Sequence, residues 1–408
     1  MSVISNAQKE QQEKAVTQYD VVIVGAGPYG LSIAAHLLAK GLNVAIFGKP
    51  LELWREHMPR GMNLRSHWWA TNLSDPKQHY TFKRFLKLKG YSQEHPTPMA
   101  HFIEYATWFQ QNVVPNVDET YVASIERNNG LYTVNLEDGR VVRTPSVVMA
   151  IGVYYFANKP TEYDVLPPEL VSHSFEYANF ERFKGKHVLI VGAGQSGVEN
   201  AALAYEEGVE VSLLARRPIL WLAPDRTDER TLKQKIQAPN AGIAPGWANW
   251  ALEAFPYLFY RLSQPAKDKY LRTHYNAAAS DWLFDRTKDK VHIYEQRTVT
   301  QLEPKDGGCD VTLSDGERFH VDHIMLATGY VVNVKKMTML APALLEQLRE
   351  DNGIPQLNSW FETNMPGLYF VGLSSIRGFG PLYRFVVGAK AAAPRVASAV
   401  ARRAARHK

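Results

Sequence analysis

Two segments of the chain share one pattern of apolar and polar positions. In each, four aliphatic residues precede three spaced glycines, and an alanine-rich run follows. The segments read VVIVGAGPYGLSIAAHL from Val21 to Leu37 and VLIVGAGQSGVENAALA from Val188 to Ala204. A short apolar run bounded by glycine predicts a buried strand, and the longer run after it predicts a helix. The chain therefore contains an internal repeat of strand, tight turn and helix.

Both turns have the spacing G-x-G-x-x-G, with glycine at Gly25, Gly27, Gly30, Gly192, Gly194 and Gly197. In dinucleotide-binding proteins the first glycine allows the turn, the second lets the backbone approach a pyrophosphate, and the third packs the helix on the strand. Free N–H groups at the start of the helix then bind the phosphates. A glycine turn without a ligand is the alternative, but the context at both copies favours two dinucleotide sites.

The residues after the following strand indicate which dinucleotide is bound. An acidic residue about 20 positions on would bind a ribose hydroxyl, and neither copy has one. The first strand, NVAIF, ends in Phe47-Gly48-Lys49, and the second, VEVSLLARRP, ends in Arg216 and Arg217. A guanidinium favours the 2′-phosphate of NADP, so NADPH is predicted at the second copy. Two solvated arginines in a surface loop are the alternative.

Two further segments repeat a different pattern. LYTVNLEDGRVVRTPSVVMAIG and CDVTLSDGERFHVDHIMLATG each contain a strand, an Asp-Gly turn, a second strand and an apolar strand that ends in glycine. Asp-Gly between alternating strands is a hairpin signal, and it occurs at Asp138-Gly139 and Asp315-Gly316. The order of these elements predicts an α/β protein with two doubly wound sheets, each in its own domain.

Composition narrows the classes of function. The chain has 408 residues and 46 Lys+Arg against 41 Asp+Glu, and part of this excess lies in the last seven residues, RRAARHK. This charge balance gives no indication of a nucleic-acid-binding surface. The single Cys309 excludes an internal disulfide, a C-x-x-C pair and a cysteine-built metal site. The polar N-terminal segment lacks a signal-peptide core, and no apolar run is long enough to span a membrane, so a cytoplasmic protein is expected.

Other motifs carry little chemistry. None of the 13 histidines forms a helical metal-binding pair at i and i+4, and we predict no metal. His67, beside Trp68 and Trp69, could steer protons near a cofactor, although such residues more often pack. The aromatic run WANWALEAFPYLFYRL, residues 247–262, is interrupted by Pro256. It is interpreted as core, as a subunit contact, or as a lid over the cofactor that excludes water.

At this point the sequence resembles the class B flavin-dependent monooxygenases, which include flavin-containing monooxygenases and the lysine and ornithine N-hydroxylases. GAGPYGL resembles their FAD fingerprint, and HSFEYANFERFKGKHVLIVGAGQSGVE resembles the lead-in to their NADPH fingerprint. TNLSDPKQHYTFKRFLKLKGY, LATGY and GLYFVGLSSIRGFGPLYRFVVGAKAAA are similar to three further family segments. The resemblance covers about residues 20–400 and is weak from 219 to 290, where substrate identity should reside.

The resemblance implies site residues. For binding the two cofactors it implies the glycines of both turns together with Pro28, Trp54, Ser66, Gly152, Arg216, Arg217, Gly329, Gly372, Gly380 and Leu382. For supporting the chemistry it implies Asn72, Gln195 and Ser196. The small residues Gly378, Gly380 and Gly388 would suit close approach of the backbone to a cofactor.

The resemblance also implies a Rossmann-like NADPH domain inserted into an FAD domain. We expect a polar tail at residues 1–18, the first part of the FAD domain at 19–158 and its second part at 322–400. The NADPH domain occupies 159–321, with a helical, aromatic segment at 219–290, and a basic tail follows at 401–408.

The implied function is an NADPH- and O₂-dependent monooxygenase that oxygenates a small nucleophilic substrate, such as an amine, through a flavin hydroperoxide. One alternative is an FAD-dependent hydroxylase of an aromatic or purine ring. Others are an NADPH:flavin oxidoreductase and a redox-sensing binding protein. A homo-oligomer is an open alternative, and the substrate is not predicted beyond its class.

Overall fold

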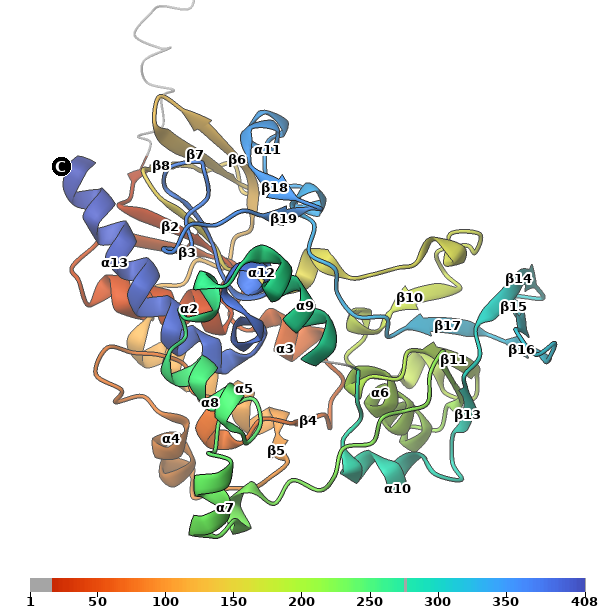
Figure 1. Ribbon diagram of the computed structural model, residues 1–408. Coiled ribbons are helices and arrows are strands. Elements are labelled where there is room, and N and C mark those ends of the chain that lie inside the picture. The colour runs from red at the N-terminus through yellow and green to blue at the C-terminus, as the bar shows by residue number, and fades with distance from the viewer. Residues whose placement is uncertain (1–16, 275–276, 408) are drawn as a thin grey trace, which may run out of the picture.

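The computed structural model describes residues 17–274 and 277–407. Two parallel sheets dominate it, and each is built around one of the glycine repeats (Figure 1). The first sheet has the order β20-β9-β2-β3, and all of its neighbours pair in parallel. Its strands are Val21–Val24 (β2), Val44–Phe47 (β3), Val147–Met149 (β9) and Leu368–Phe370 (β20).

The second sheet is also parallel and has the order β10-β17-β11-β12-β13. Its strands are Val171–His173 (β10), His187–Val191 (β11), Glu210–Ala215 (β12), His292–Glu295 (β13) and His323–Leu326 (β17). Side chains of β11 and β17 are buried on both faces of the sheet, which is why these strands are continuous apolar runs rather than alternating ones. The predicted α/β class with two dinucleotide-binding sheets is confirmed.

The two predicted hairpins form a smaller sheet beside each parallel one. Strands β6, β7 and β8 join the short β1, and β14, β15 and β16 form a three-stranded sheet. Gly139 and Gly316 have φ of 83° and 88° in the two Asp-Gly turns, a backbone conformation that glycine adopts without strain. The strands are Thr17–Gln18 (β1), Val122–Asn128 (β6), Leu131–Leu136 (β7), Val141–Thr144 (β8), Val299–Lys305 (β14), Gly308–Leu313 (β15) and Arg318–Val321 (β16).

Helices cover the first sheet through apolar faces. Helix α2 (Pro28–Leu38) packs against α13 (Ala389–His407), and Leu31, Val396 and Val400 are fully buried in the shared core. Residues 401–407 of the predicted basic tail form the last turns of α13. The guanidinium of Arg402 lies 3.8 Å from the ring centre of Trp360. Residues 1–16 of the predicted polar tail lie outside the described residues.

Further elements complete the two domains. Helix α6 (Gln195–Glu206) follows β11 and covers the second sheet. The remaining elements near the first sheet are Glu52–Glu56 (α3), Asn63–Leu64 (β4), Phe82–Lys89 (α4), Thr97–Pro98 (β5), Met99–Val113 (α5), Pro342–Gln347 (α11), Glu350–Asp351 (β18), Ile354–Pro355 (β19) and Ile376–Phe379 (α12).

The two connections between the domains lie side by side. Ala157 and Tyr330 form an antiparallel bridge, and the N–H of Asn158 donates to the carbonyl of Gly329 at 2.9 Å. The chain therefore leaves the second sheet after β17, not before it. The boundary predicted at residue 322 falls too early, because β17 pairs with β10 and β11. An apolar strand does not reveal in the sequence which sheet it joins.

Residues 219–290, called here the covering segment, lie largely against the first domain. The segment contains Leu232–Gln237 (α7), Trp247–Ala254 (α8), Gln264–His274 (α9) and Phe284–Thr287 (α10). Helix α9 contacts α12, and in Figure 1 both α8 and α9 lie on the side of the first domain, away from the second sheet. The hydroxyl of Tyr257 donates to the carbonyl of Ala391 at 2.6 Å, and Asp268 forms two hydrogen bonds with Arg377 at 2.9 and 3.0 Å. The part of the segment that contains α8 and α9 thus packs on the first domain, whereas α10 packs on α6 of the second.

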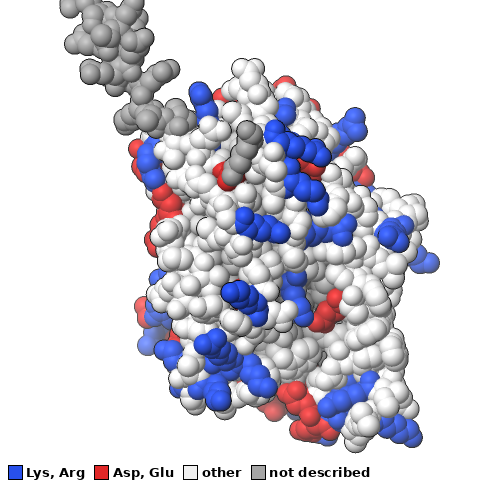
Figure 2. Space-filling view, turned by 90° about the vertical axis from the view of Figure 1, so that its left-hand side faces the viewer, with Lys and Arg blue, Asp and Glu red and all other residues white. Residues whose placement is uncertain are grey.

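The surface gives limited information on partners. Within residues 17–274 and 277–407, no helix has the length and apolar character needed to cross a membrane. On the face shown in Figure 2, basic side chains occur in separate groups, with acidic side chains between them and at the edges.

Candidate dinucleotide and active site

The first glycine turn is closed by backbone contacts and open at one position. A Cβ on Gly25, whose φ is +105°, would lie 2.5 Å from the carbonyl oxygen of Ala150. A Cβ on Gly30 would lie 1.9 Å from the carbonyl oxygen of Gly25, whereas one on Gly27 would meet nothing within 4 Å. Two of the glycines are therefore required by packing, and the space beside Gly27 is available to a ligand.

The second turn repeats this geometry. A Cβ on Gly192, at φ +135°, would lie 2.4 Å from the carbonyl oxygen of Ala327, and one on Gly197 would lie 1.9 Å from that of Gly192. At Gly194 the nearest atom would be the Cβ of Ala277, at 3.5 Å, an ordinary contact. The repeat that the sequence predicts is thus a repeat in three dimensions. It includes the neighbouring parallel strand, β9 or β17, which is followed directly by Ala150 or Ala327.

Both helices begin without a side-chain cap. Gly27 and Gly194 occupy the N-cap positions of α2 and α6, and neither supplies a side-chain acceptor. Pro28 occupies the first helical position, where its missing N–H is not needed. The remaining N–H groups and the positive end of the helix dipole suit a pyrophosphate. The residues present therefore fit a dinucleotide at each turn.

The predicted glycines Gly152 and Gly329 come shortly after β9 and β17. These strands pair in parallel with β2 and β11, the strands that lead into the two turns. The φ values of the two glycines are 62° and 80°, so both permit the turn out of the strand. His173, which the sequence did not single out, lies beside the second of them. Its Nε2 donates to the carbonyl of Gly329 at 3.0 Å, and burial lowers its pKa to about 4. A neutral His173 thus holds the connection between the domains.

An acidic residue begins α3, the helix that lies against the first turn, although the sequence offered none at the end of β3. The N–H of Leu51 donates to the carbonyl of Ala26 at 3.2 Å, which places the start of α3 against the turn. Glu52 is the next residue, and its carboxylate accepts a hydrogen bond from the hydroxyl of Tyr121. The search for an acid at the end of β3 missed Glu52 because it lies beyond the strand, at the start of the next helix.

Three other predicted site residues, Trp54, Ser66 and Asn72, lie in α3 or in the connection between α3 and α4. The ring of Trp54 packs edge-on against Phe102, with centroids 4.7 Å apart, and the hydroxyl of Ser66 lies 2.9 Å from that of Thr71. The amide of Asn72 donates to the carbonyl of Trp69 at 2.7 Å and accepts from the N–H of Phe82 at 2.8 Å. Asn72 therefore fixes the start of α4, and a role in catalysis stays a prediction.

The C-terminal segment lies on the start of α2. The hydroxyl of Tyr29 is 2.9 Å from the carbonyl oxygens of both Tyr383 and Phe385. A Cβ on Gly372 would lie 3.6 Å from the Tyr29 ring, and one on Gly388 would lie 2.3 Å from its hydroxyl.

At Gly380 a Cβ would lie 2.8 Å from the ring of Phe259, in the covering segment. The missing side chains at Gly380 and Gly388 therefore make room for aromatic residues of the protein. Leu382 is buried, and Gly378 has open space where a Cβ would be. That Gly372, Gly380 and Leu382 contact a cofactor stays a prediction.

Gln195 and Ser196 begin α6 and lie between three parts of the chain. The Gln195 side-chain oxygen accepts from the N–H and hydroxyl of Ser280, and its amide donates to Glu199 at 3.0 Å. The other oxygen of Glu199 accepts from the N–H of Asn63 at 2.9 Å, and burial raises the pKa of this carboxyl. The Ser196 hydroxyl lies 3.5 Å from that of Ser174. Gln195 thus connects the second turn to the covering segment and, through Glu199, to the first domain.

Four arginines are candidates for anionic ligands. Arg216 and Arg217 follow β12 directly and are exposed. The sequence did not single out Arg65 and Arg384. Partial burial of the guanidinium, and to a smaller degree the charge of Arg384, lower the pKa of Arg65. Among the ion pairs of residues 17–274 and 277–407, none includes these four side chains.

The aromatic run at 247–262 divides into two halves. Phe259 is buried, and Tyr257 and Tyr260 pack against the core of the first domain. Trp247, Phe255 and Leu258 are more than half exposed. The run is therefore core on one side and surface on the other. The lid interpretation stays a prediction for the half that contacts Gly380.

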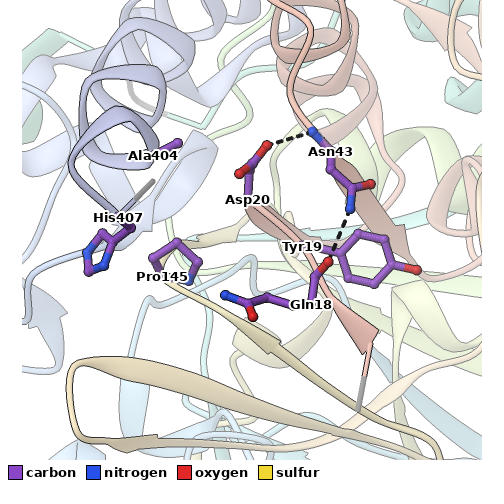
Figure 3. A pocket seen from close by; sticks show the side chains of 7 residues that line it. All are labelled: Gln18, Tyr19, Asp20, Asn43, Pro145, Ala404 and His407. Carbon is purple, nitrogen blue, oxygen red and sulfur yellow. Dashed lines mark hydrogen bonds between the residues drawn. The ribbon is translucent and has the colours of Figure 1, made fainter. Parts of the chain in front are cut away.

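A hollow in the first domain lies at the wrong end of the sheet for a dinucleotide. It is shown in Figure 3 and lies between the start of β2 and the end of α13, where the N–H of Asn43 donates to Asp20 at 2.8 Å. Ligands of parallel sheets bind at the carboxyl ends of the strands, where the glycine turns lie. The hollow therefore belongs to neither turn.

Comparisons with known proteins agree with this geometry. The family described as pyridine nucleotide-disulphide oxidoreductase matches residues 22–238, more than half of the chain, and a second model with the same description matches residues 265–375. An indole-3-pyruvate monooxygenase of Oryza sativa subsp. japonica is 27% identical over 399 residues, which cover 90% of this chain and 89% of that protein.

Solved structures show the same fold at low identity. The ornithine hydroxylase PvdA of Pseudomonas aeruginosa is 18% identical with a TM-score of 0.74, over 95% of this chain and all of that one. The cadaverine monooxygenase DfoA of Erwinia amylovora, solved with FAD bound, is 17% identical with a TM-score of 0.70, over 94% of each chain.

These relatives confirm the predicted resemblance to flavin-dependent monooxygenases, and the two turns suit FAD and NADPH. The chain is an oxidoreductase and belongs to the pyridine nucleotide-disulphide oxidoreductase family.

Proposed function

We propose that this protein is an NADPH- and O₂-dependent flavoprotein monooxygenase that oxygenates a small nucleophilic substrate. The observation that carries the proposal is the pair of equivalent glycine turns, each with an uncapped helix start and one open glycine, Gly27 or Gly194. One oxygen atom of O₂ would enter the substrate and the other would leave as water, with two electrons from NADPH. Bound FAD would supply this oxygen-transfer chemistry.

The residues of the chain would bind and orient the two cofactors and shield the reacting atoms from water. The first turn and Glu52 would hold FAD, with the Glu52 carboxylate accepting from a ribose hydroxyl. The second turn would hold NADPH, with Arg216 and Arg217 on the 2′-phosphate. The covering segment packs on the C-terminal glycines through Phe259, where it would exclude water from the reacting atoms.

The main alternative function within the family is reduction of a disulfide, and the chain lacks the residues that it needs. A reductase that uses a dithiol needs two cysteines, and this chain has only Cys309. Its thiol is buried, and burial raises its pKa, so it holds less of the reactive thiolate. Reduction of a disulfide substrate is therefore the weaker assignment.

The substrate is proposed to carry an anionic group. Arg65 and Arg384 are exposed, the charge of Arg384 acts on Arg65, and neither forms an ion pair with a carboxylate in the described chain. Such a pair attracts a carboxylate, which a guanidinium binds with two parallel hydrogen bonds. Amines, sulfides and carbonyl compounds that bear a carboxylate are thus the first to test, each beside its neutral amide.

Isotope labelling tests the function. With ¹⁸O₂, NADPH and a panel of acids and matched amides, we expect one ¹⁸O atom in the product of an acid and one product for each NADPH consumed. Replacing Arg65 and Arg384 by alanine should remove the preference for acid over amide. NADPH oxidation that yields only hydrogen peroxide, or passes electrons to an acceptor without labelled product, would identify an oxidase or a reductase instead.

A further inference from the structure

Two histidines and an aspartate form a cluster that the proposed function does not use. His67 follows β4, His95 precedes β5, and Asp225 lies near the start of the covering segment. One ligand-type atom from each residue can be chosen so that all three lie within 4.8 Å of one another. The sequence predicted no metal because it was searched for local spacing, whereas these residues are far apart along the chain.

The pairing of β4 with β5 brings the two rings together. Leu64 lies opposite Thr97 in this antiparallel pair, so the chain just beyond Leu64 faces the chain just before Thr97. The imidazoles of His67 and His95 stack with centroids 3.9 Å apart and planes 14° apart. Both Nε2 atoms lie near Oδ2 of Asp225. The in-plane lone pairs of stacked rings run nearly parallel, so one ring must turn about its Cβ–Cγ bond for both nitrogens to bind one ion.

Asp225 completes the cluster from the covering segment. Its Oδ2 lies 3.1 Å from His67 Nε2 and 3.6 Å from His95 Nε2. Its Oδ1 accepts from the N–H of Thr227 at 2.8 Å, which leaves Oδ2 directed at the rings. The carboxylate is thus held in place by its own turn.

Several ring nitrogens of His67 and His95 have no hydrogen-bond partner. His67 is 6% exposed. Among the described residues, Nδ1 of His67 and both ring nitrogens of His95 are buried without a hydrogen-bond partner. A buried nitrogen without a partner destabilises the folded chain. An ion that accepts the electron pair of His95 Nε2 would remove this cost at that atom.

The spacing fits one transition-metal ion. With Zn–N bonds of about 2.0–2.1 Å, tetrahedral ligand atoms lie roughly 3.3 Å apart. The distances of 3.1 and 3.6 Å from Asp225 to the two nitrogens lie on either side of this value. Two imidazoles and one carboxylate are a ligand set that suits Zn²⁺, whereas Mg²⁺ and Ca²⁺ prefer oxygen alone.

A second carboxylate, that of Asp228, lies near the other nitrogen of the His67 ring. Asp228 Oδ2 lies 3.4 Å from His67 Nδ1, on the other side of the ring from Asp225. A carboxylate in this position favours the tautomer with hydrogen on Nδ1 and leaves Nε2 free to bind a metal.

We propose that His67 Nε2, His95 Nε2 and Asp225 Oδ2 are the protein ligands of a zinc site, with Asp228 positioning His67. The site joins the β4–β5 pair of the first domain to the covering segment. Bound zinc therefore fastens the segment in place, and its binding stabilises the folded chain by mass action.

Zinc binding by the full-length chain tests this site. After removal of metal with a chelator, we expect one Zn²⁺ per chain by calorimetry, no response to Mg²⁺, and a higher melting temperature with zinc. Co²⁺ should give the visible absorption of a tetrahedral site. The variants His95→Gln and Asp225→Asn should each weaken zinc binding at least a hundredfold, and Asp228→Asn about tenfold.

His79→Gln is the matched control, because His79 is exposed and lies outside the cluster. It should bind zinc as the unchanged chain does. Asp225→Asn is nearly isosteric and lies in a partly exposed turn, so it keeps the test valid if His95→Gln fails to fold. No binding by the unchanged chain, or equal binding by Asp225→Asn, would overturn the proposal and leave the cluster as an ion pair only.

Discussion

The side-chain oxygen of Gln195 accepts two hydrogen bonds from Ser280, from the N–H at 2.9 Å and from the hydroxyl at 2.8 Å. Gln195 begins α6 at the second glycine turn, and Ser280 lies near the end of the covering segment. One side chain therefore couples the second glycine turn to the segment that packs on the first domain.

Replacing Gln195 by alanine should destabilise the chain by about 1–3 kcal/mol, because the Ser280 N–H would lose its partner. Ser280→Ala keeps that N–H bond and loses only the hydroxyl bond, so its cost should be smaller, about 0.5–1.5 kcal/mol. Urea unfolding of both variants measures the difference. Equal losses would mean that the N–H bond contributes nothing.

Alanine at the open glycines should separate ligand binding from folding. Gly27→Ala meets no atom within 4 Å and Gly194→Ala meets only an ordinary contact, so both variants should fold. The first should be purified with little FAD, and the second with normal FAD but a raised Michaelis constant for NADPH. Circular dichroism and the flavin content measure the two effects.

Gly30→Ala is the comparison, since its Cβ would lie 1.9 Å from the carbonyl oxygen of Gly25. This variant should lose both FAD and stability. If Gly27→Ala retained FAD at full occupancy, the first turn would not be the FAD site.

Arg216 and Arg217 should determine the choice of nicotinamide cofactor. Replacing both by alanine removes charged hydrogen bonds to the 2′-phosphate, each worth about 1.5–3 kcal/mol. The Michaelis constant for NADPH should rise at least tenfold, with little change for NADH. A double variant with the same loss of charge at the exposed Lys390 and Arg406 of α13 is the control. An unchanged NADPH to NADH ratio would refute the assignment.

The two halves of the aromatic run should respond differently to alanine. Phe259 is 3% exposed, so Phe259→Ala should cost about 3–5 kcal/mol through the cavity it leaves. Trp250 is 37% exposed, and Trp250→Ala should cost less than about 1 kcal/mol. Thermal and urea unfolding test both values.

If Phe259 also shields the reacting atoms, Phe259→Ala should lower the yield of oxygenated product per NADPH and raise that of hydrogen peroxide. A loss of stability with an unchanged yield would assign Phe259 to packing alone.

Acid should destabilise the chain through His323. Burial lowers the pKa of this ring to about 4, and its Nε2 lies 2.7 Å from the hydroxyl of Ser172. In the unfolded chain the pKa is about 6.5, so the unfolded state binds more protons between about pH 6.5 and 4. Stability should therefore fall with falling pH in that window, by up to about 1.4 kcal/mol per pH unit.

His323→Gln should reduce this slope, and His79→Gln, at an exposed position, should not. The free energy of unfolding in urea at about pH 7 and pH 5 measures it. His173 has a similarly lowered pKa, so part of the slope should persist in the single variant. An identical slope in His323→Gln would show that His323 is not the group responsible.

Local features of the sequence were enough to predict both glycine turns and both Asp-Gly hairpins. These elements depend on backbone conformations that only particular residues adopt easily, such as the positive φ at Gly25, Gly192, Gly139 and Gly316. The resemblance to flavin monooxygenases rests on the same short segments. The fold class followed from their order along the chain.

Contacts between distant residues could not be predicted in this way. The apolar strand at 323–326 fits either sheet by pattern, and only its pairing with β10 and β11 assigns it to the second. Glu52 begins a helix that lies against the first turn because the N–H of Leu51 donates to the carbonyl of Ala26. The cluster of His67, His95 and Asp225 forms because strand pairing and the path of the covering segment join three segments. Sequence periodicity records the conformation of neighbouring residues, and these distances depend on how separate elements pack together.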